Sequence, residues 1–271
     1  MSDTSYYFLP WVRYGLLKND KGMPVLGENA FQGGLSLPER AKITVNLNLN
    51  DQPVKVNDLS LFGPGDVSGI DSREIVRTEP QHLTPDFLPN LFPFIEFDRP
   101  DFPWLFTPGK PDANGCLLPW IVLVVLRKDN GKIITDPAKS SPELECEIKE
   151  LPDLNESWAW AHAQYVGTSG ASQDHISNEL AGKPLQNVSR LICPRKLQAN
   201  VHYMACVVPA FKVIESVDQD GVKSGQLAPA WKLSDSGIIR LPVYYHWEFS
   251  TAMEGDFESF IKRLKMPGEL D

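Results

Sequence analysis

The sequence predicts a mixed α+β, β-rich protein with many short strands, proline- and glycine-rich loops, and two or three helices. Of the 271 residues, 23 are proline and 19 are glycine, a composition that favours short strands and turns over long helices. One segment alternates apolar and polar residues and another is apolar almost throughout, and both patterns indicate strands. We expect one elaborated domain over residues 1–271, with a surface insertion at 216–236.

The N-terminal half holds the clearest strand pattern. Apolar residues occupy alternate positions from 43 to 49, so they share one face of a strand. A turn and renewed alternation over 51–56 predict a β-hairpin. The glycine-rich segment 63–71 lacks the Lys-Ser or Lys-Thr of a phosphate-binding loop, and we interpret it as a structural turn. A short strand is expected at 74–77.

A buried strand is predicted over 117–126, where nearly every residue is apolar, as in strands that are covered on both faces. The sequence Asp129-Asn130-Gly131 is typical of a hairpin turn. We therefore expect Ile133 and Ile134 to pair back onto the buried strand. Further strands are predicted at 202–208 and over 238–249.

Two helices are predicted from their apolar spacing. Residues 151–165 form the first, with Asp153 as its N-cap and Glu156 three positions later. Its apolar face would consist of Leu154, Trp158, Ala161 and Tyr165. A closing amphipathic helix is predicted over 257–264, where acidic residues precede the segment and basic residues end it, which suits the helix dipole.

The segment 95–108 mixes charges, aromatic rings and prolines. Its prolines remove backbone donors and fix φ, so we expect an ordered, extended loop that is neither a helix nor an ordinary strand. The rings are too apolar for a disordered linker, and they would fill either the chain's own core or a subunit interface. An alternative is a substrate cleft lined by Glu96, Asp98 and Asp101.

Charge and cysteine usage narrow the class of protein. The net charge of −9 and the absence of a basic stripe argue against nucleic-acid binding. The cysteines Cys116, Cys146, Cys193 and Cys206 form no Cys-x-x-Cys pair, so we expect free, buried thiols and no metal. The N-terminus has no signal-peptide pattern and the longest apolar run is too short for a bilayer. We expect synthesis in the cytoplasm and no direct membrane insertion.

Two histidines are the main candidates for chemistry. His162 is expected to be a buried, hydrogen-bonded histidine of the first helix, and the alternative is a general base. Alternation places Tyr244, His246 and Glu248 on one strand face, which suits a polar contact surface, and the alternative is a metal site. No Gly-x-Ser-x-Gly motif is present. We therefore assign no catalytic residue and no cofactor, and a hydrolase using His162 or His246 with a carboxylate is the alternative.

Aromatic residues on ordered loops favour a component of an assembly, because such rings bury much area with little loss of rotamer freedom. The residues expected at an interface are Trp11, Phe97, Asp98, Arg99, Phe102, Trp104, Phe106 and Trp247. An alternative is a carbohydrate- or peptide-binding module in which Trp104, Trp120 and Trp247 are stacking platforms.

Several blocks resemble one family of proteins. They are FLPWVR at 8–13, GPGDV at 63–67, EFDRPDFPWLFTP at 96–108, WAWAH at 158–162, SRL at 189–191, CPR at 193–195 and PVYYHWEFST at 242–251. In these blocks the chain resembles a family of uncharacterised proteins from gene clusters of extracellular contractile injection systems, which are phage-tail-like particles. The resemblance covers about residues 6–265, and some relatives are longer, so the chain resembles their N-terminal portion.

The resemblance implies a non-catalytic structural component of the particle. The expected positions are the cap or its adaptor, or the baseplate and its surrounding shell. Partners would be cap, sheath, tube or baseplate proteins, with copies of the chain arranged in a ring. The particle itself would be released or membrane-associated.

Overall fold

Strands dominate the described part of the chain, which confirms the β-rich, mixed fold class. The computed structural model describes residues 16–18, 42–49, 52–60, 67–105, 107, 111–139, 141–165, 167, 172, 174, 175, 178, 187–217 and 223–253. Trp11, Phe106, residues 63–66 of the glycine-rich segment 63–71 and the helix expected at 257–264 lie outside these residues.

The described residues form sixteen strands and several short 3-10 helices. The strands are β1 (Leu16–Lys18), β2 (Lys42–Leu49), β3 (Gln52–Ser60), β4 (Val67–Ile70), β5 (Ile75–Glu79), β6 (Phe94–Phe97), β7 (Ile121–Arg127), β8 (Gly131–Ile134), β9 (Glu143–Glu147), β10 (Ala161–Gln164), β11 (Val188–Ile192), β12 (His202–Pro209), β13 (Phe211–Val217), β14 (Lys223–Pro229), β15 (Ile238–Pro242) and β16 (Tyr245–Ser250). The 3-10 helices are η3 (Ser72–Glu74), η4 (Phe102–Trp104), η5 (Lys128–Asn130), η6 (Ile148–Glu150) and η7 (Leu154–Trp160).

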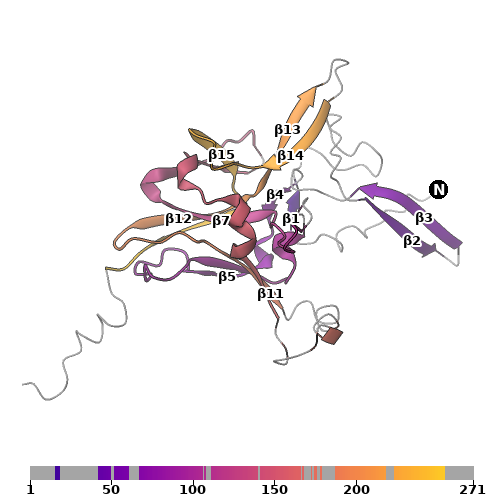
Figure 1. Cartoon of the computed structure of the whole chain (residues 1–271), viewed down its shortest axis with the longest axis horizontal. Helices are drawn as coiled ribbons and strands as arrows, with labels where there is room; N and C mark the ends of the chain where they lie inside the picture. The colour runs from indigo at the N-terminus through magenta and orange to yellow at the C-terminus, as the bar shows by residue number, and fades with distance from the viewer. Residues whose placement is uncertain are drawn as a thin grey trace, which may run out of the picture.

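The body consists of three antiparallel sheets that lie one above another (Figure 1). The central sheet has the order β16-β12-β7. A four-stranded sheet, β10-β11-β6-β5, covers one of its faces, and the sheet β15-β9-β8 covers the other. Strands β7 and β12 are therefore buried on both sides, whereas β16 buries one face.

Strand β7 shows how the sequence produces two cores. Successive side chains of a strand point to opposite faces. Leu123 and Val125 accordingly join the core toward the four-stranded sheet, whereas Val124 and Leu126 join the core toward β15-β9-β8. The prediction of a strand buried on both faces is confirmed.

The core toward the four-stranded sheet is rich in aromatic rings. Phe97 and Phe102 have ring centroids 4.6 Å apart, and Phe102 packs edge-on against Trp120 at 6.1 Å. Tyr203 stacks on Phe249 at 5.6 Å. Large rings bury much apolar area and pack with defined geometry, so they hold the two sheets together.

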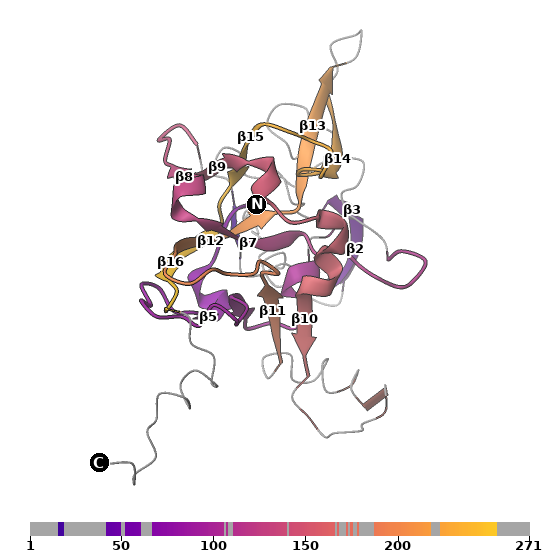
Figure 2. The same ribbon diagram turned by 60° about the vertical axis from the view of Figure 1, so that its left-hand side comes forward.

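Two hairpins extend from this body (Figures 1 and 2). Strands β2 and β3 form one, with Leu49 opposite Gln52 at its tip, which confirms the predicted hairpin. Strands β13 and β14 form the other, with Val217 opposite Lys223, and this hairpin includes much of the segment 216–236. Among the described elements, the strands of each hairpin contact mainly each other.

The helix predicted over 151–165 is wrong in type and length. Its first half is the 3-10 helix η7, and the rest is strand β10. Asp153 does cap η7, because its side chain accepts a hydrogen bond from the Asn155 backbone N–H at 3.0 Å. Beyond Trp160, pairing with β11 replaces helical hydrogen bonds, since Ala161 lies opposite Leu191 and faces the core. Of the predicted apolar face, Trp158 is exposed.

The hairpin predicted after β7 is also wrong. The turn at Lys128–Asn130 is present as η5, but β8 leaves the central sheet and pairs with β9 instead. Pairing with β9 places Ile133 opposite Leu144. Ile133 therefore packs against the core between the central sheet and the sheet β15-β9-β8. Burial of apolar surface therefore decides the pairing, rather than the sequence of the turn.

The aromatic–proline segment contains more regular structure than predicted. Residues Phe94–Phe97 form strand β6, because the prolines begin only at Pro100. Pro103 lies in the first turn of η4, where a missing backbone N–H costs little. Residues 95–105 and 107 of the segment are described, and the rings of Phe97 and Phe102 fill the chain's own core.

Candidate functional site

The outer face of the four-stranded sheet carries the strongest polar cluster among the described residues. Alternation along β6 directs Ile95 and Phe97 into the core, where both are fully buried. Glu96 lies between them and points to the opposite face. The neighbouring strands contribute Arg77 from β5 and Arg190 from β11, since the register places each of them opposite Glu96.

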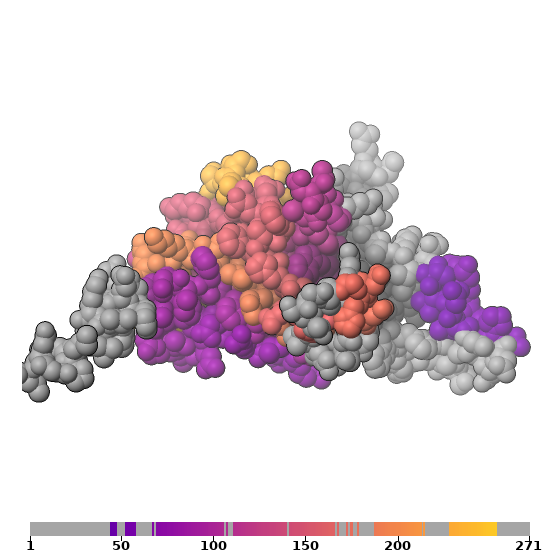
Figure 3. Space-filling model, turned by 60° about the horizontal axis from the view of Figure 1, so that its bottom comes forward, coloured from indigo at the N-terminus to yellow at the C-terminus, as the bar shows by residue number. Residues whose placement is uncertain are grey.

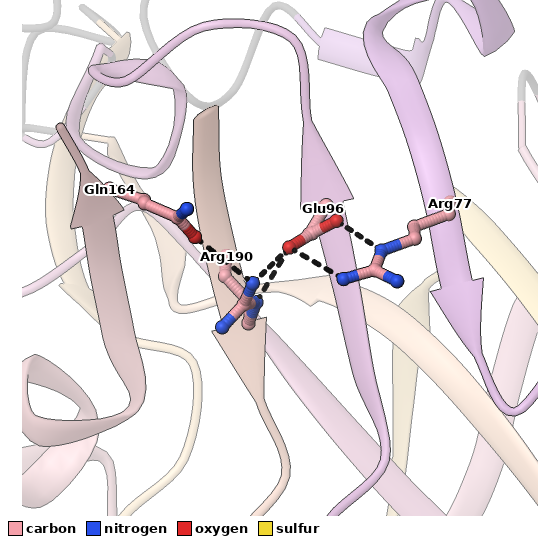
Figure 4. Close-up of polar contacts among 4 residues, drawn as sticks. All are labelled: Arg77, Glu96, Gln164 and Arg190. Carbon is pink, nitrogen blue, oxygen red and sulfur yellow. Dashed lines mark hydrogen bonds and ion pairs between the residues drawn. The ribbon is translucent and has the colours of Figure 1, made fainter. Parts of the chain in front are cut away.

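The two arginines bind the same carboxylate from opposite sides (Figure 4). Arg77 donates to both Glu96 oxygens, and its Nη2 lies 3.3 Å from Oε1. Arg190 donates to Oε1 through Nε at 3.0 Å and also through Nη2. Gln164 of β10 accepts a further hydrogen bond from Arg190 Nη2 at 3.3 Å. The cluster thus links all four strands of the sheet.

The aromatic ring of Phe94 supports both guanidinium groups. The ring centroid lies 5.2 Å from Cζ of Arg77 and 4.7 Å from Cζ of Arg190. Both distances fall within the range of cation–π attraction. The ring and the carboxylate therefore fix the orientation of two cations on one sheet face.

The cluster combines a buried anion with accessible cations. Glu96 is only 5% exposed, whereas the side chains of Arg77 and Arg190 are 54% and 27% exposed. Burial alone would raise the pKa of Glu96, but hydrogen bonds and charge from the arginines outweigh it and lower that pKa. The pKa of Arg77 is raised, chiefly by its hydrogen bond to Glu96. Glu96 is therefore an ionised anchor, not a proton donor.

This arrangement can recognise anions and planar groups. Guanidinium groups bind carboxylates and phosphates with directional hydrogen bonds, and they stack on aromatic or amide planes. The cluster was not predicted, although its sequence signal exists: Glu96 stands between Ile95 and Phe97, and Arg190 precedes two apolar residues in a short strand. The signal did not show that the two strands are neighbours, and this register brings the residues together.

In the alternative interpretation, Glu96, Asp98 and Asp101 line a substrate cleft, but the carboxylates of Glu96 and Asp101 are each paired with arginine. The two arginines already occupy the Glu96 carboxylate. Asp101 accepts hydrogen bonds from Arg99 at 3.1 and 3.0 Å.

Three of the predicted interface residues must be reassigned. Phe97, Phe102 and Trp247 are fully buried in the chain's own core, where no partner reaches them, because the central and four-stranded sheets close over the rings. Asp98, Arg99 and Trp104 are half-buried. Trp11 and Phe106 lie outside the described residues.

The stacking-platform alternative is likewise corrected. Trp120 and Trp247 are buried, with exposures of 0% and 1%. The indole N–H of Trp120 donates to the Phe102 carbonyl at 2.8 Å. Trp104 is half-buried, and its indole donates to the Leu117 carbonyl at 3.2 Å. Two of the three rings are therefore inaccessible to a sugar or a peptide.

His162 is exposed, which corrects the prediction of a buried histidine. It lies on β10 opposite Arg190, and its Nε2 is 3.0 Å from the Ala159 carbonyl oxygen. The correction has a physical cause, because a strand directs His162 outward where a helix would have placed it beside Trp158.

His246 and Glu248 share one face of β16, as the alternation predicts. Glu248 forms an ion pair with Lys128, and its Oε2 lies 3.3 Å from Nε2 of His202. The backbone N–H of Glu248 donates to His82 Nδ1 at 3.2 Å. Sequence reasoning missed Lys128, His82 and His202, which come from three other segments.

Burial is the main influence on the pKa of His246. Burial lowers its pKa, although the nearby Glu248 carboxylate opposes that shift. The pKa of Glu248 is lowered, first by its hydrogen bond with Lys128. Tyr244 does not share this face, contrary to the prediction, because it lies before β16 and is buried in the aromatic core. Across the described part of the chain, no group of three or more potential ligands has metal-binding geometry.

The cysteine thiols of the described chain are free. Cys146, Cys193 and Cys206 are buried, as predicted, whereas Cys116 is half-buried. Burial raises the pKa of Cys146 and of Cys193 to about 11. A thiol with so high a pKa is a poor nucleophile at neutral pH, so these cysteines act as packing residues.

Comparison with known protein families, with curated proteins and with solved structures found no match. Within the described residues, no helix has the length and apolar character needed to cross a membrane.

Proposed function

We propose that the chain is a non-catalytic structural component of a contractile injection particle, in the cap, the cap adaptor, the baseplate or its shell. The observation that carries this proposal is the pair of hairpins that extend from a three-layered body (Figures 1 and 2). The resemblance of the aromatic and proline-rich blocks to proteins of these gene clusters indicates the kind of particle.

The hairpins suit a role in contacts between subunits. A two-stranded hairpin is at best marginally stable alone in water, so it gains from packing against another surface. On β3, Val54 and Val56 are exposed, and on β13 Ile214 is exposed. Long strands with exposed apolar side chains are also templates for pairing with another chain. Neighbouring copies in a ring are the proposed partners.

The body suits a role as a rigid support for these arms. Its aromatic core joins the central and the four-stranded sheets, and close-packed interiors deform little. The outer sheet face adds a second contact surface, because Arg77 and Arg190 present fixed guanidinium groups there. Arginine and aromatic residues are enriched at the energetic centres of protein interfaces.

Replacing one arm tests the proposal. Lys212 and Ala228 lie opposite each other in the β13–β14 ladder, so an Asn-Gly turn can join them in place of residues 213–227. We expect a folded variant whose Tm changes by only about 2–4 °C, corresponding to roughly 1 kcal/mol, and whose incorporation into particles is lost. A substitution in the exposed 136–139 loop, such as Ala138→Gly, is the matched control. Full incorporation of the arm variant would contradict the proposal.

A further inference from the structure

The loop between β5 and β6 exposes a group of large apolar side chains. We call Leu88, Leu91, Phe92 and the nearby Met253 the apolar patch. Leu91, Phe92 and Met253 are 46%, 51% and 70% exposed, and Leu88 is also exposed. Single exposed apolar residues are ordinary, but several on one loop indicate a surface that another segment covers.

The loop is held firmly, so its exposed residues are displayed in a fixed arrangement. It runs along the edge of β16, where Leu83 N–H donates to the Glu248 carbonyl at 2.7 Å and Phe87 N–H donates to the Ser250 carbonyl at 3.0 Å. Phe87 is buried and packs edge-on against Phe249 at 5.5 Å. A turn closes with Leu91 N–H donating to the Leu88 carbonyl at 3.1 Å.

The described chain ends beside this patch. Phe87 and Thr251 form a parallel bridge, and Ala252 N–H donates to the Phe87 carbonyl at 2.9 Å. Beyond these residues the two segments leave side by side, one toward Leu88 and the other toward Met253. Residues 254–256 separate Met253 from position 257, a span of at most about 14 Å. The patch is thus within reach of the segment that follows.

The sequence of that segment fits an apolar surface. Phe257, Phe260, Ile261 and Leu264 have the spacing i, i+3, i+4, i+7, which places them on one face of a helix. The polar residues of the segment, among them Glu258 and Lys262, fall on the opposite face.

We propose that residues 257–264 dock in the same molecule onto the apolar patch as an amphipathic helix, with Phe257, Phe260, Ile261 and Leu264 facing Leu88, Leu91 and Phe92. The short span from Met253 favours the chain's own segment over that of another copy. The docked helix covers the end of β16 and the loop beside it. This inference does not depend on the proposed function, because it rests on the patch, the chain path and the apolar spacing.

Paired cysteines test the contact directly. In a Cys116→Ser background of the full chain, Phe92→Cys with Ile261→Cys should form a disulfide within one molecule under mild oxidation, read as a faster non-reduced band and a mass loss of two hydrogens. Phe92→Cys with Lys262→Cys, on the opposite helix face, is the matched control and should crosslink far less. Equal crosslinking of the two pairs, crosslinks only between molecules, or none would overturn the proposal.

A thermal measurement gives an independent readout. The pair Phe260→Ser and Ile261→Ser should lower Tm by about 3 °C or more and increase the binding of a hydrophobic dye, since the patch becomes uncovered. Lys262→Ser should leave both unchanged. Tm and dye binding equal to those of the unaltered chain in the double variant would count against docking.

Discussion

Glu96 illustrates how one residue can be charged and nearly buried in an open sheet. Removing a carboxylate from water is costly unless other groups satisfy it. Arg77 and Arg190 do so from the adjacent strands, and Phe94 holds their guanidinium groups in place. One carboxylate therefore links the outer faces of the three strands β5, β6 and β11.

Glu96→Gln should lower the free energy of unfolding by about 2 kcal/mol, because hydrogen bonds to charged groups contribute this much and the two arginines lose their shared anion. Denaturant unfolding measures the change. Glu145→Gln is the matched control, since that carboxylate also binds two cations, Lys132 and Arg240, whose side chains are mostly exposed. Exposed pairs contribute little, so the control should lose much less. If the two variants lose equal free energy of unfolding, burial of the Glu96 carboxylate does not account for its contribution.

The same residue predicts a pH dependence. The pKa of Glu96 in the folded chain lies below its ordinary value of 4.5, so the unfolded chain binds the proton more readily. The stabilisation is therefore complete above pH 4.5 and is lost as the pH falls through the folded pKa. Between pH 5 and pH 3, Tm should fall more steeply for the unaltered chain than for Glu96→Gln. Parallel profiles would show that Glu96 titrates normally.

At the scale of elements, local pattern identified some strands and failed for others. Alternation predicted β2, and continuous apolar sequence predicted β7, because each pattern reports burial of the strand itself. The sequence around β10 has helical spacing, yet its pairing with β11 prevails. Tertiary pairing of this kind has no local signal, and the same holds for β8, which pairs with β9 after a turn typical of a hairpin.

The cap of η7 is a local feature that sequence did predict. Asp153→Ala should lower the free energy of unfolding by about 1 kcal/mol, because the Asn155 N–H loses its acceptor. Asp129→Ala in the first turn of η5 is the control, because that turn has no side-chain capping bond. Urea unfolding of the two variants makes the comparison, and a loss no larger for Asp153→Ala would contradict the capping role.

At the scale of the molecule, the candidate site could be predicted less well than the fold. Glu96 and Arg190 are 94 positions apart, and Lys128 and Glu248 are 120 apart, so only strand order brings each pair together. The aromatic rings expected at an interface were placed wrongly. Phe97, Phe102 and Trp247 are expected at an interface from the sequence but are buried in the chain's own core, because sequence alone does not distinguish a core ring from an interface ring.

The molecule has three packed layers and two hairpins that extend from them. The aromatic core fixes the body, while the hairpins extend beyond it (Figure 3 shows β2 and β3 set apart from the body). Such a division of roles favours a subunit whose contacts lie at its periphery. In a closed ring each arm would meet the same surface of the next copy.

The native mass of the full chain, measured alone and after co-expression with cap, sheath, tube and baseplate proteins of the particle, tests the structural role most directly. We predict either a ring, seen as a mass several times that of the 30.3 kDa chain, or a stable complex with at least one of those proteins. A monomer under both conditions, with none of those proteins bound, would contradict the assignment to the particle.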